Sequence, residues 1–349
     1  MGVACRDPGI DVCRVVTTYL IVVLHAWGAA SQYGVSGSLE SAVWKFIGIN
    51  CVMGMYVLFV VSGYLMFEGL ECLKDWQRKM SRRLRRLVVP YLCWNLVFVL
   101  LYLAVGNLFP RIGERIAKFG LDTWFGAFSK IGGLLTMPID FPLWYMRTIF
   151  MFALAAPIMG FALRRQIGRW IGLGAVMGYY LLVEEFRVLP DVEAYPAFAL
   201  LLWYCGGLMT RVRSNGLGLC EWFRNPWWIA VGMAGFALDG LEAMDICDLL
   251  SFRSRMILKS CVFLCLVRAF RRTNVAPFLD FSFFVYCGHF LFCSVWVHTL
   301  GPKLAGIGLG CESALMLAFI IPGLALTAGV YALSKKLCPK VLKLFNGTL

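Results

Sequence analysis

The stretch RVVTTYLIVVLHAWG, residues 14–28, is apolar or weakly polar between its arginine and a histidine eleven positions later. A helix rises about 1.5 Å per residue, so His25 lies about 16 Å beyond Arg14, well inside a hydrocarbon core about 30 Å thick. The stretch therefore predicts a membrane-spanning helix. An ionisable side chain at that depth is costly in lipid, and we expect it to face a polar or water-filled interior.

The whole chain has the composition of a membrane protein. Of its 349 residues 60% are hydrophobic and 15% are charged, whereas soluble domains average about 45–50% and about 25%. The apolar residues fall in repeated runs, which predict an all-α, polytopic transmembrane helical bundle with about ten spanning helices. No segment between the runs is long enough to fold alone, so we expect a single integral membrane domain over 1–349, with the first span retained. The predicted spans are 12–31, 46–67, 87–108, 143–163, 168–184, 196–210, 227–241, 254–270, 281–300 and 313–333.

The basic residues set the expected orientation. With the N-terminus inside, twenty of the 33 lysines and arginines fall in cytoplasmic segments and eight in outer loops. The positive-inside rule then predicts that both termini are cytoplasmic. The net charge of +13 marks this membrane surface, so we expect a lipid bilayer as partner and no nucleic acid.

Most of the fourteen cysteines lie inside the apolar runs. There is no CxxC, and the cysteine and histidine spacings do not suit zinc, so we expect small buried hydrophobes and no metal.

His25 is the first candidate for chemistry. A histidine titrates near neutral pH and suits the role of general base. The alternative is a neutral histidine that hydrogen-bonds to a neighbouring helix.

An arginine cluster, SRRLRRLVVPYLCW, separates the second and third spans. One explanation is anchoring at the cytoplasmic membrane surface. The other is an anion site, because guanidinium groups bind phosphates in bidentate geometry. Arg83 and Arg86 are spaced i, i+3 and would share a helix face.

Three other spans carry polar residues with weaker signals. Ser62 and Gly63, in VLFVVSGYLMF, form a small-residue notch for close helix packing. FPLWYMR, residues 141–147, offers Trp144 and Tyr145 as interfacial anchors, with an unusual arginine, Arg147, that would snorkel outward or pair with an acid.

In FLDFSFFVYCGHF, residues 278–290, one face carries Ser282, Tyr286 and His289, which indicate a polar interior or an interhelical hydrogen-bonding seam. The third histidine, His298, falls near the outer end.

Five of these motifs occur in an order that resembles the acyltransferase 3 family of bacterial integral membrane O-acyltransferases. They are Arg14-x10-His25, FVVSGYL, the RRLRR-to-Pro90 stretch, LWY before the fourth span and FSFFVYCGH. The resemblance covers nearly the whole chain. The chain departs from the family pattern at Tyr145, where phenylalanine is more usual, and at Arg147, and no further soluble domain is expected.

The resemblance implies transfer of an acyl group, most often acetyl, from acyl-CoA to a hydroxyl. The implied acceptors are sugars of cell-envelope or exported glycans or their lipid-linked precursors, and the implied location is the bacterial inner membrane. His25 and Arg14 match the family's catalytic motif. Arg83 and Arg86 match its arginine pair for the donor, with Arg82 and Arg85 as an equally spaced register. Ser62, Trp144, Tyr286 and His289 are expected to support the substrate site.

The competing hypothesis is a transporter or flippase for a polar or lipid-linked solute. Arg255 and Lys259, at i, i+4 in the eighth span, would then line a path. They could instead pair with acids of the adjoining outer segment, namely Asp239, Glu242, Asp245 or Asp248. A purely structural subunit would explain neither His25 nor the arginine cluster.

Overall fold

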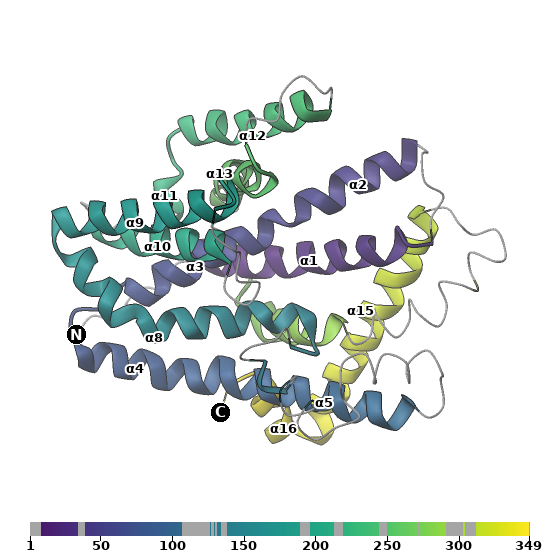
Figure 1. Cartoon of the computed structure of the whole chain (residues 1–349). Coiled ribbons are helices and arrows are strands. Elements are labelled where there is room, and N and C mark those ends of the chain that lie inside the picture. Colours follow the sequence, from purple (N-terminus) through teal and green to yellow (C-terminus); the bar gives the residue numbers. More distant parts are fainter. Residues whose placement is uncertain are drawn as a thin grey trace. The chain divides into compact units, whose positions relative to one another are not determined.

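A computed structural model describes the chain as an assembly of helices (Figure 1). It describes residues 8–33, 39–106, 126, 129, 131–133, 138–188, 196–212, 219–243, 250–270, 272–290, 303 and 312–348. No strand occurs among these residues, which confirms the all-α prediction for the part of the chain that is described.

The elements follow the order of the predicted spans. They are α1 (Pro8–Ala30), α2 (Leu39–Cys51), α3 (Met53–Phe67), α4 (Leu73–Arg83), the π-helical turn η1 (Leu84–Val88), α5 (Val89–Gly106), the 3₁₀ turn η2 (Phe141–Leu143), α8 (Trp144–Arg164), α9 (Gln166–Glu184), α10 (Ala197–Val212), α11 (Leu219–Trp222), α12 (Trp227–Ala243), α13 (Phe252–Ala269), the 3₁₀ turn η3 (Ala276–Phe278), a helix over 279–290, α15 (Glu312–Leu337) and α16 (Pro339–Phe345).

Five helical segments among the described residues are long and apolar enough to cross a membrane. They are Pro8–Ala30, Leu39–Phe67, Leu73–Ala104, Phe141–Arg164 and Glu312–Leu337, and α10 is a shorter apolar helix. Each predicted span coincides with a helix over its described part. The count of ten crossings and the cytoplasmic placement of both termini stay predictions.

The chain forms two compact units, and each is built from separate stretches of sequence. The first unit comprises Met1–Leu24, Phe46–Trp76 and Ala155–Ser282, and the second comprises His25–Lys45, Gln77–Leu154 and Phe283–Leu349.

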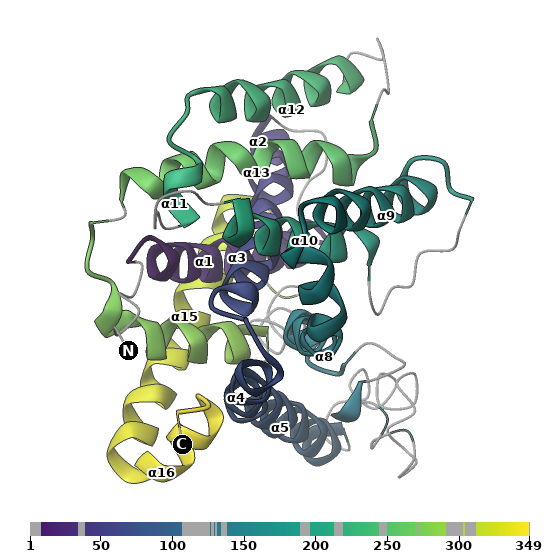
Figure 2. The ribbon, with the colours of Figure 1, turned by 90° about the vertical axis from the view of Figure 1, so that its left-hand side faces the viewer.

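In the first unit α3 packs closely against α10 (Figures 1 and 2). Glycines make this approach possible. A Cβ atom at Gly63 would lie 1.9 Å from the carbonyl oxygen of Trp203, and one at Gly206 would lie 2.0 Å from that of Val60. The small-residue notch predicted at residues 62–63 is therefore confirmed, because the facing backbone occupies the space that a side chain would take. The ring of Tyr56 also stacks on that of Phe198, with centroids 4.6 Å apart.

We expect Gly206→Ala to destabilise the first unit. The new methyl group cannot coexist with the carbonyl of Val60, so the helices must separate, at a cost of about 1–3 kcal/mol or more. Thermal unfolding in detergent measures the effect. Gly178→Ala is the matched control, because Gly178 lies in α9 with nothing within 4 Å of its added Cβ. Equal melting temperatures for the two variants would contradict the close packing of α3 and α10.

Buried charges join α12 to α13 in the same unit, where the two helices lie side by side (Figure 2). Lys259 is 0% exposed. Its Nζ forms an ion pair with Asp239 and donates to Oδ1 of Asn50 at 3.0 Å. The guanidinium of Arg255 pairs with the other oxygen of Asp239 at 2.7 Å and with Glu242. The predicted pairing with Asp239 and Glu242 is confirmed, whereas Asp245 and Asp248 lie outside the described residues.

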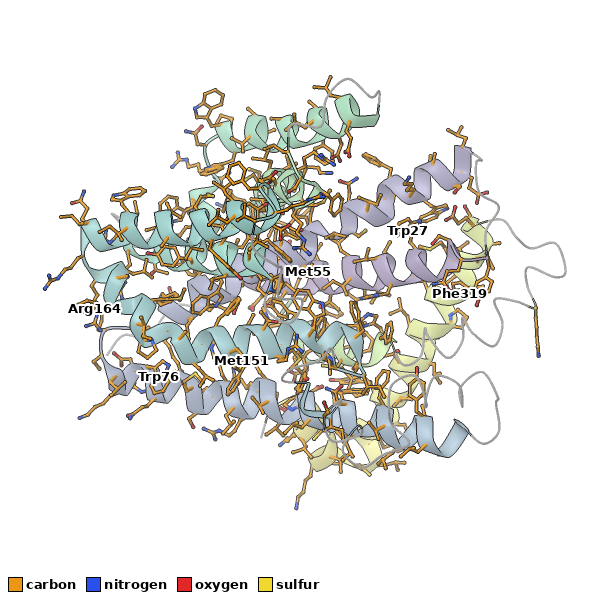
Figure 3. All side chains as sticks on the ribbon, viewed as in Figure 1. Trp27, Met55, Trp76, Met151, Arg164 and Phe319 are labelled. Atoms are coloured by element: carbon orange, nitrogen blue, oxygen red, sulfur yellow. The ribbon has the colours of Figure 1, made fainter. Side chains whose placement is uncertain are left out.

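The end of α8 is tied to the segment before α4 in the first unit. Figure 3 labels Arg164 at the last turn of α8. Its guanidinium donates to the carbonyl oxygen of Glu71, and Arg211 of α10 forms an ion pair with the Glu71 carboxylate at 2.6 Å. These contacts fix the chain as it leaves α3.

In the second unit aromatic rings hold α5, the 279–290 helix, α15 and α16 together. The ring of Trp94 lies 5.1 Å from that of Phe284 and 5.3 Å from that of Phe345. Phe98 stacks on Phe290 at 6.3 Å, and Phe284 contacts Tyr331 at 5.4 Å. This packing fixes the rotation of the 279–290 helix, and with it the direction of the histidine near its end.

Candidate active site

The first helix carries both residues of the Arg14-x10-His25 motif. α1 is continuous from Pro8 to Ala30, and eleven residues at 100° each bring Arg14 and His25 to nearly the same helix face. The side chain of Arg14 is exposed, and that of His25 is partly buried. The helix therefore presents a cation at one level and an imidazole about 16 Å further along.

Three aromatic rings among the described residues of the second unit lie around His25. The ring of His289 lies 5.3 Å away, that of Phe290 5.5 Å and that of Phe141 6.2 Å, centroid to centroid. Both phenylalanines meet the imidazole edge to face. Two of the sequence-predicted site residues, His25 and His289, are thus brought together from opposite ends of the chain.

The chain that leads into α8 is held by side chains of α5. The hydroxyl of Tyr91 donates to the carbonyl oxygen of Gly132 at 3.1 Å. Asn95, one turn later, accepts a hydrogen bond from the backbone N–H of Asp140 at 3.1 Å. The hydroxyl of Tyr286 then donates to the carbonyl oxygen of Pro142 at 2.5 Å. The start of α8 is therefore positioned from two helices at once. Tyr286 thus bonds outside its own helix, whereas Ser282 and His289 on the same face bond to carbonyl oxygens of their own helix.

Asp140 is a buried acid at the start of this segment that none of the sequence motifs contains. Its side chain is 0% exposed, and its carboxyl oxygens have no hydrogen-bond partner among the described residues. Burial raises the pKa of the Asp140 carboxyl well above its usual range. The available signal was an acid directly before the FPLWYMR motif, at the point where a span begins.

Two interpretations of the FPLWYMR motif change. Trp144 is only 9% exposed, so it packs in the protein interior and does not act as the interfacial anchor that the sequence suggested. Arg147 does not snorkel outward, because its side chain is buried and donates to the carbonyl oxygen of Gly133. Tyr145 is half-buried and its ring lies 6.4 Å from that of Tyr286.

The arginine cluster lies where α4 passes through the π-helical turn into α5. Arg82, Arg85 and Arg86 are exposed, whereas Arg83 is half-buried. The placement of Arg83 and Arg86 on one face assumed a regular α-helix. The wider i→i+5 turn from Leu84 to Val88 rotates the following residues, and the two arginines differ in exposure.

A row of rings leads through the second unit to His25. The Tyr145 ring lies 6.4 Å from that of Tyr286, and the Tyr286 ring lies 6.4 Å from that of His289. His289 in turn faces His25. Of the other sequence-predicted residues, Ser62 is buried within α3 of the first unit, and His298 lies outside the described residues.

The fold and these residues define a multi-pass membrane protein with an imidazole pair inside its helices. A family model described as an acyltransferase domain matches residues 7–334. The chain belongs to the acyltransferase 3 family, as its motifs indicated, and is an acyltransferase. No curated protein and no solved structure matches it.

Proposed function

We propose that this protein transfers an acyl group, most often acetyl, from acyl-CoA to a hydroxyl of a cell-envelope or exported glycan or its lipid-linked precursor. The proposal places it in the bacterial inner membrane. The observation that carries it is the position of His25, an imidazole inside the helices that lies against a second imidazole at 5.3 Å. Membership of the acyltransferase 3 family supports the same reaction class.

The arginine cluster suits the phosphates of the donor. Three of its four guanidinium groups are exposed, so they are accessible to an anionic ligand, and charge-assisted hydrogen bonds from arginine to phosphate are strong. In the proposed reaction the donor enters from the cytoplasm with its phosphates at the arginine cluster and its thioester directed towards His25.

The imidazole of His25 acts as general base. It removes the proton of the acceptor hydroxyl as the oxygen attacks the thioester carbonyl, and the proton then passes to the departing thiolate, which leaves as CoA. Positioned proton transfer contributes about 10²–10⁴-fold. Orientation of donor and acceptor by the helices supplies much of the remainder. Phe141 and Phe290 lie beside the imidazole, with ring centroids 6.2 Å and 5.5 Å from that of His25.

The transporter hypothesis relied on Arg255 and Lys259 of the first unit as residues that would line a solute path. Arg255 and Lys259 are paired with Asp239 and Glu242 between α12 and α13, so these two cations are accounted for by helix packing.

Release of CoA by the purified protein tests the enzyme against the transporter. In detergent, with acetyl-CoA and an envelope extract, we expect free thiol to appear together with acetylated glycan. Neither the free thiol nor the acetylated glycan should form when the envelope extract is left out. If the protein binds a component of the extract but releases no CoA thiol, the result supports the transporter hypothesis.

We expect Arg86→Gln to raise the KM for acetyl-CoA by about 10-fold or more and to leave kcat nearly unchanged. A hydrogen bond to a charged group contributes about 1.5–3 kcal/mol, and the lost contact lies far from the bond that reacts. Steady-state kinetics at several donor concentrations measure the effect. Lys340→Gln is the matched control, since it removes one exposed positive charge from α16 of the same unit. Equal KM values for the two variants would leave Arg86 as a membrane anchor only.

A further inference from the structure

The ring of His289 differs from the other two rings around His25 because it carries polar atoms. Phe141 and Phe290 present only carbon and hydrogen to the imidazole, and each meets it edge to face. His289 lies closest, at 5.3 Å between centroids, with the ring planes 37° apart. Of the three rings, it alone can exchange a hydrogen bond with His25.

The contacts of His289 settle which of its nitrogens carries the proton. Nδ1 lies 2.8 Å from the carbonyl oxygen of Tyr286 and 3.0 Å from that of Val285. A carbonyl oxygen only accepts hydrogen bonds, so Nδ1 must be the protonated nitrogen. In the neutral ring Nε2 is then an acceptor with a free lone pair. His289 is 1% exposed, and Nε2 has no hydrogen-bond partner among the described residues.

A buried acceptor without a donor is costly, about 1–3 kcal/mol, and such a group calls for an explanation. Packing alone does not supply one here. The Nδ1–H bonds to the preceding turn would hold the ring equally well if its far edge were apolar. The opposite edge of the ring instead carries Nε2, and this ring packs beside His25.

We propose that His289 is a positioning residue for His25, whose N–H it binds through Nε2 during the reaction. One nitrogen of His25 is thereby kept protonated and turned towards His289. The other nitrogen is left unprotonated and free to meet the acceptor hydroxyl. This inference rests on the proposed function of His25 as the general base.

The proton and electron balance of the step is simple. The acceptor O–H bond breaks and its proton moves to the free nitrogen of His25. The oxygen forms a bond to the thioester carbon, and the C–S bond breaks. His25 is now a cation. One of its N–H groups still donates a hydrogen bond to Nε2 of His289, and its other ring proton passes to the thiolate. His289 stays neutral throughout, so no further proton acceptor is required.

Two substitutions separate positioning from simple packing, because each keeps one half of the imidazole's hydrogen bonding. His289→Asn retains a donor near Nδ1 for the carbonyls of Val285 and Tyr286 but has no acceptor near Nε2. His289→Gln places an amide oxygen near Nε2 and gives up the Nδ1 donor. A purely structural histidine predicts that asparagine is the better replacement, whereas the positioning role predicts glutamine.

We expect His289→Asn to lower kcat about 10²-fold, the lower end of what positioned proton transfer contributes, with the KM for acetyl-CoA and the melting temperature unchanged. His289→Gln should stay within about tenfold of the wild type. The readout is CoA release from acetyl-CoA in the presence of envelope extract. An asparagine variant at least as active as the glutamine variant would overturn the proposal.

A second measurement needs no substrate. The chain has three histidines, so ¹⁵N-histidine labelling gives a spectrum in which each ring is assigned by single replacement. We expect His25 to occupy one tautomer in the wild type and in His289→Gln, and a mixture in His289→Asn. If His25 occupies the same tautomer in both variants as in the wild type, the positioning role is overturned. Full activity of His25→Ala would instead overturn the proposed function, so the two failures are distinguishable.

Discussion

Replacement of His25 by glutamine is expected to lower acyl transfer by about 10²–10⁴-fold, the range that positioned proton transfer contributes. Glutamine is polar and similar in length, but it has no basic nitrogen to take the proton of the acceptor hydroxyl. The KM for acetyl-CoA should change little, because the donor is held at the arginine cluster. Kinetics of CoA release with the purified variant measure both constants.

A control on the same helix guards against a folding defect. Tyr19 lies between Arg14 and His25 on α1 and is half-buried, so Tyr19→Phe tests the tolerance of α1 to a small change. We expect both variants to elute and melt like the wild type, with activity lost only in His25→Gln. A glutamine variant that retains the wild-type kcat would show that His25 is the neutral structural histidine allowed by the sequence.

The second large effect is expected from Asp239→Asn. The carboxylate of Asp239 neutralises Lys259, which is fully buried, and also contacts Arg255. Removal of one partner from a buried ion pair leaves an uncompensated charge and costs about 3–5 kcal/mol. We therefore expect a marked loss of stability of the first unit, measured by thermal or denaturant unfolding in detergent.

Glu242→Gln provides the comparison for this change. Glu242 contacts the same Arg255, but its side chain is 45% exposed, so we expect a loss of about 1 kcal/mol or less. The double variant Asp239→Asn with Lys259→Met should recover much of the stability, because it removes the stranded cation as well. Similar unfolding midpoints for Asp239→Asn and Glu242→Gln would contradict the buried network.

The helices of this fold were largely predictable from sequence because apolar length alone predicts a spanning segment. Their irregularities were not. The second predicted span, 46–67, is divided between α2 and α3 at Val52, and the third begins with a π-helical turn. Both depend on how neighbouring helices pack, and hydropathy carries no signal for that.

The candidate site was likewise predictable only where its residues lie close together in the sequence. The spacing from Arg14 to His25 is local, so it was visible in one stretch of sequence. The contact between His25 and His289, and the hydrogen bond from Tyr286 to Pro142 across 144 positions, arise only when distant helices meet. Asp140 was missed because a single acid beside an apolar run resembles an ordinary loop residue until its burial is known.

The central claim is that His25 directs acyl transfer to a glycan, and mass spectrometry of envelope glycans tests it most directly. Cells without the gene would be complemented with the wild-type chain or with His25→Gln. We predict that an acyl mass disappears from the glycans on deletion, returns with the wild type and does not return with the glutamine variant. Full restoration by His25→Gln, or glycans unchanged by deletion, would contradict the account.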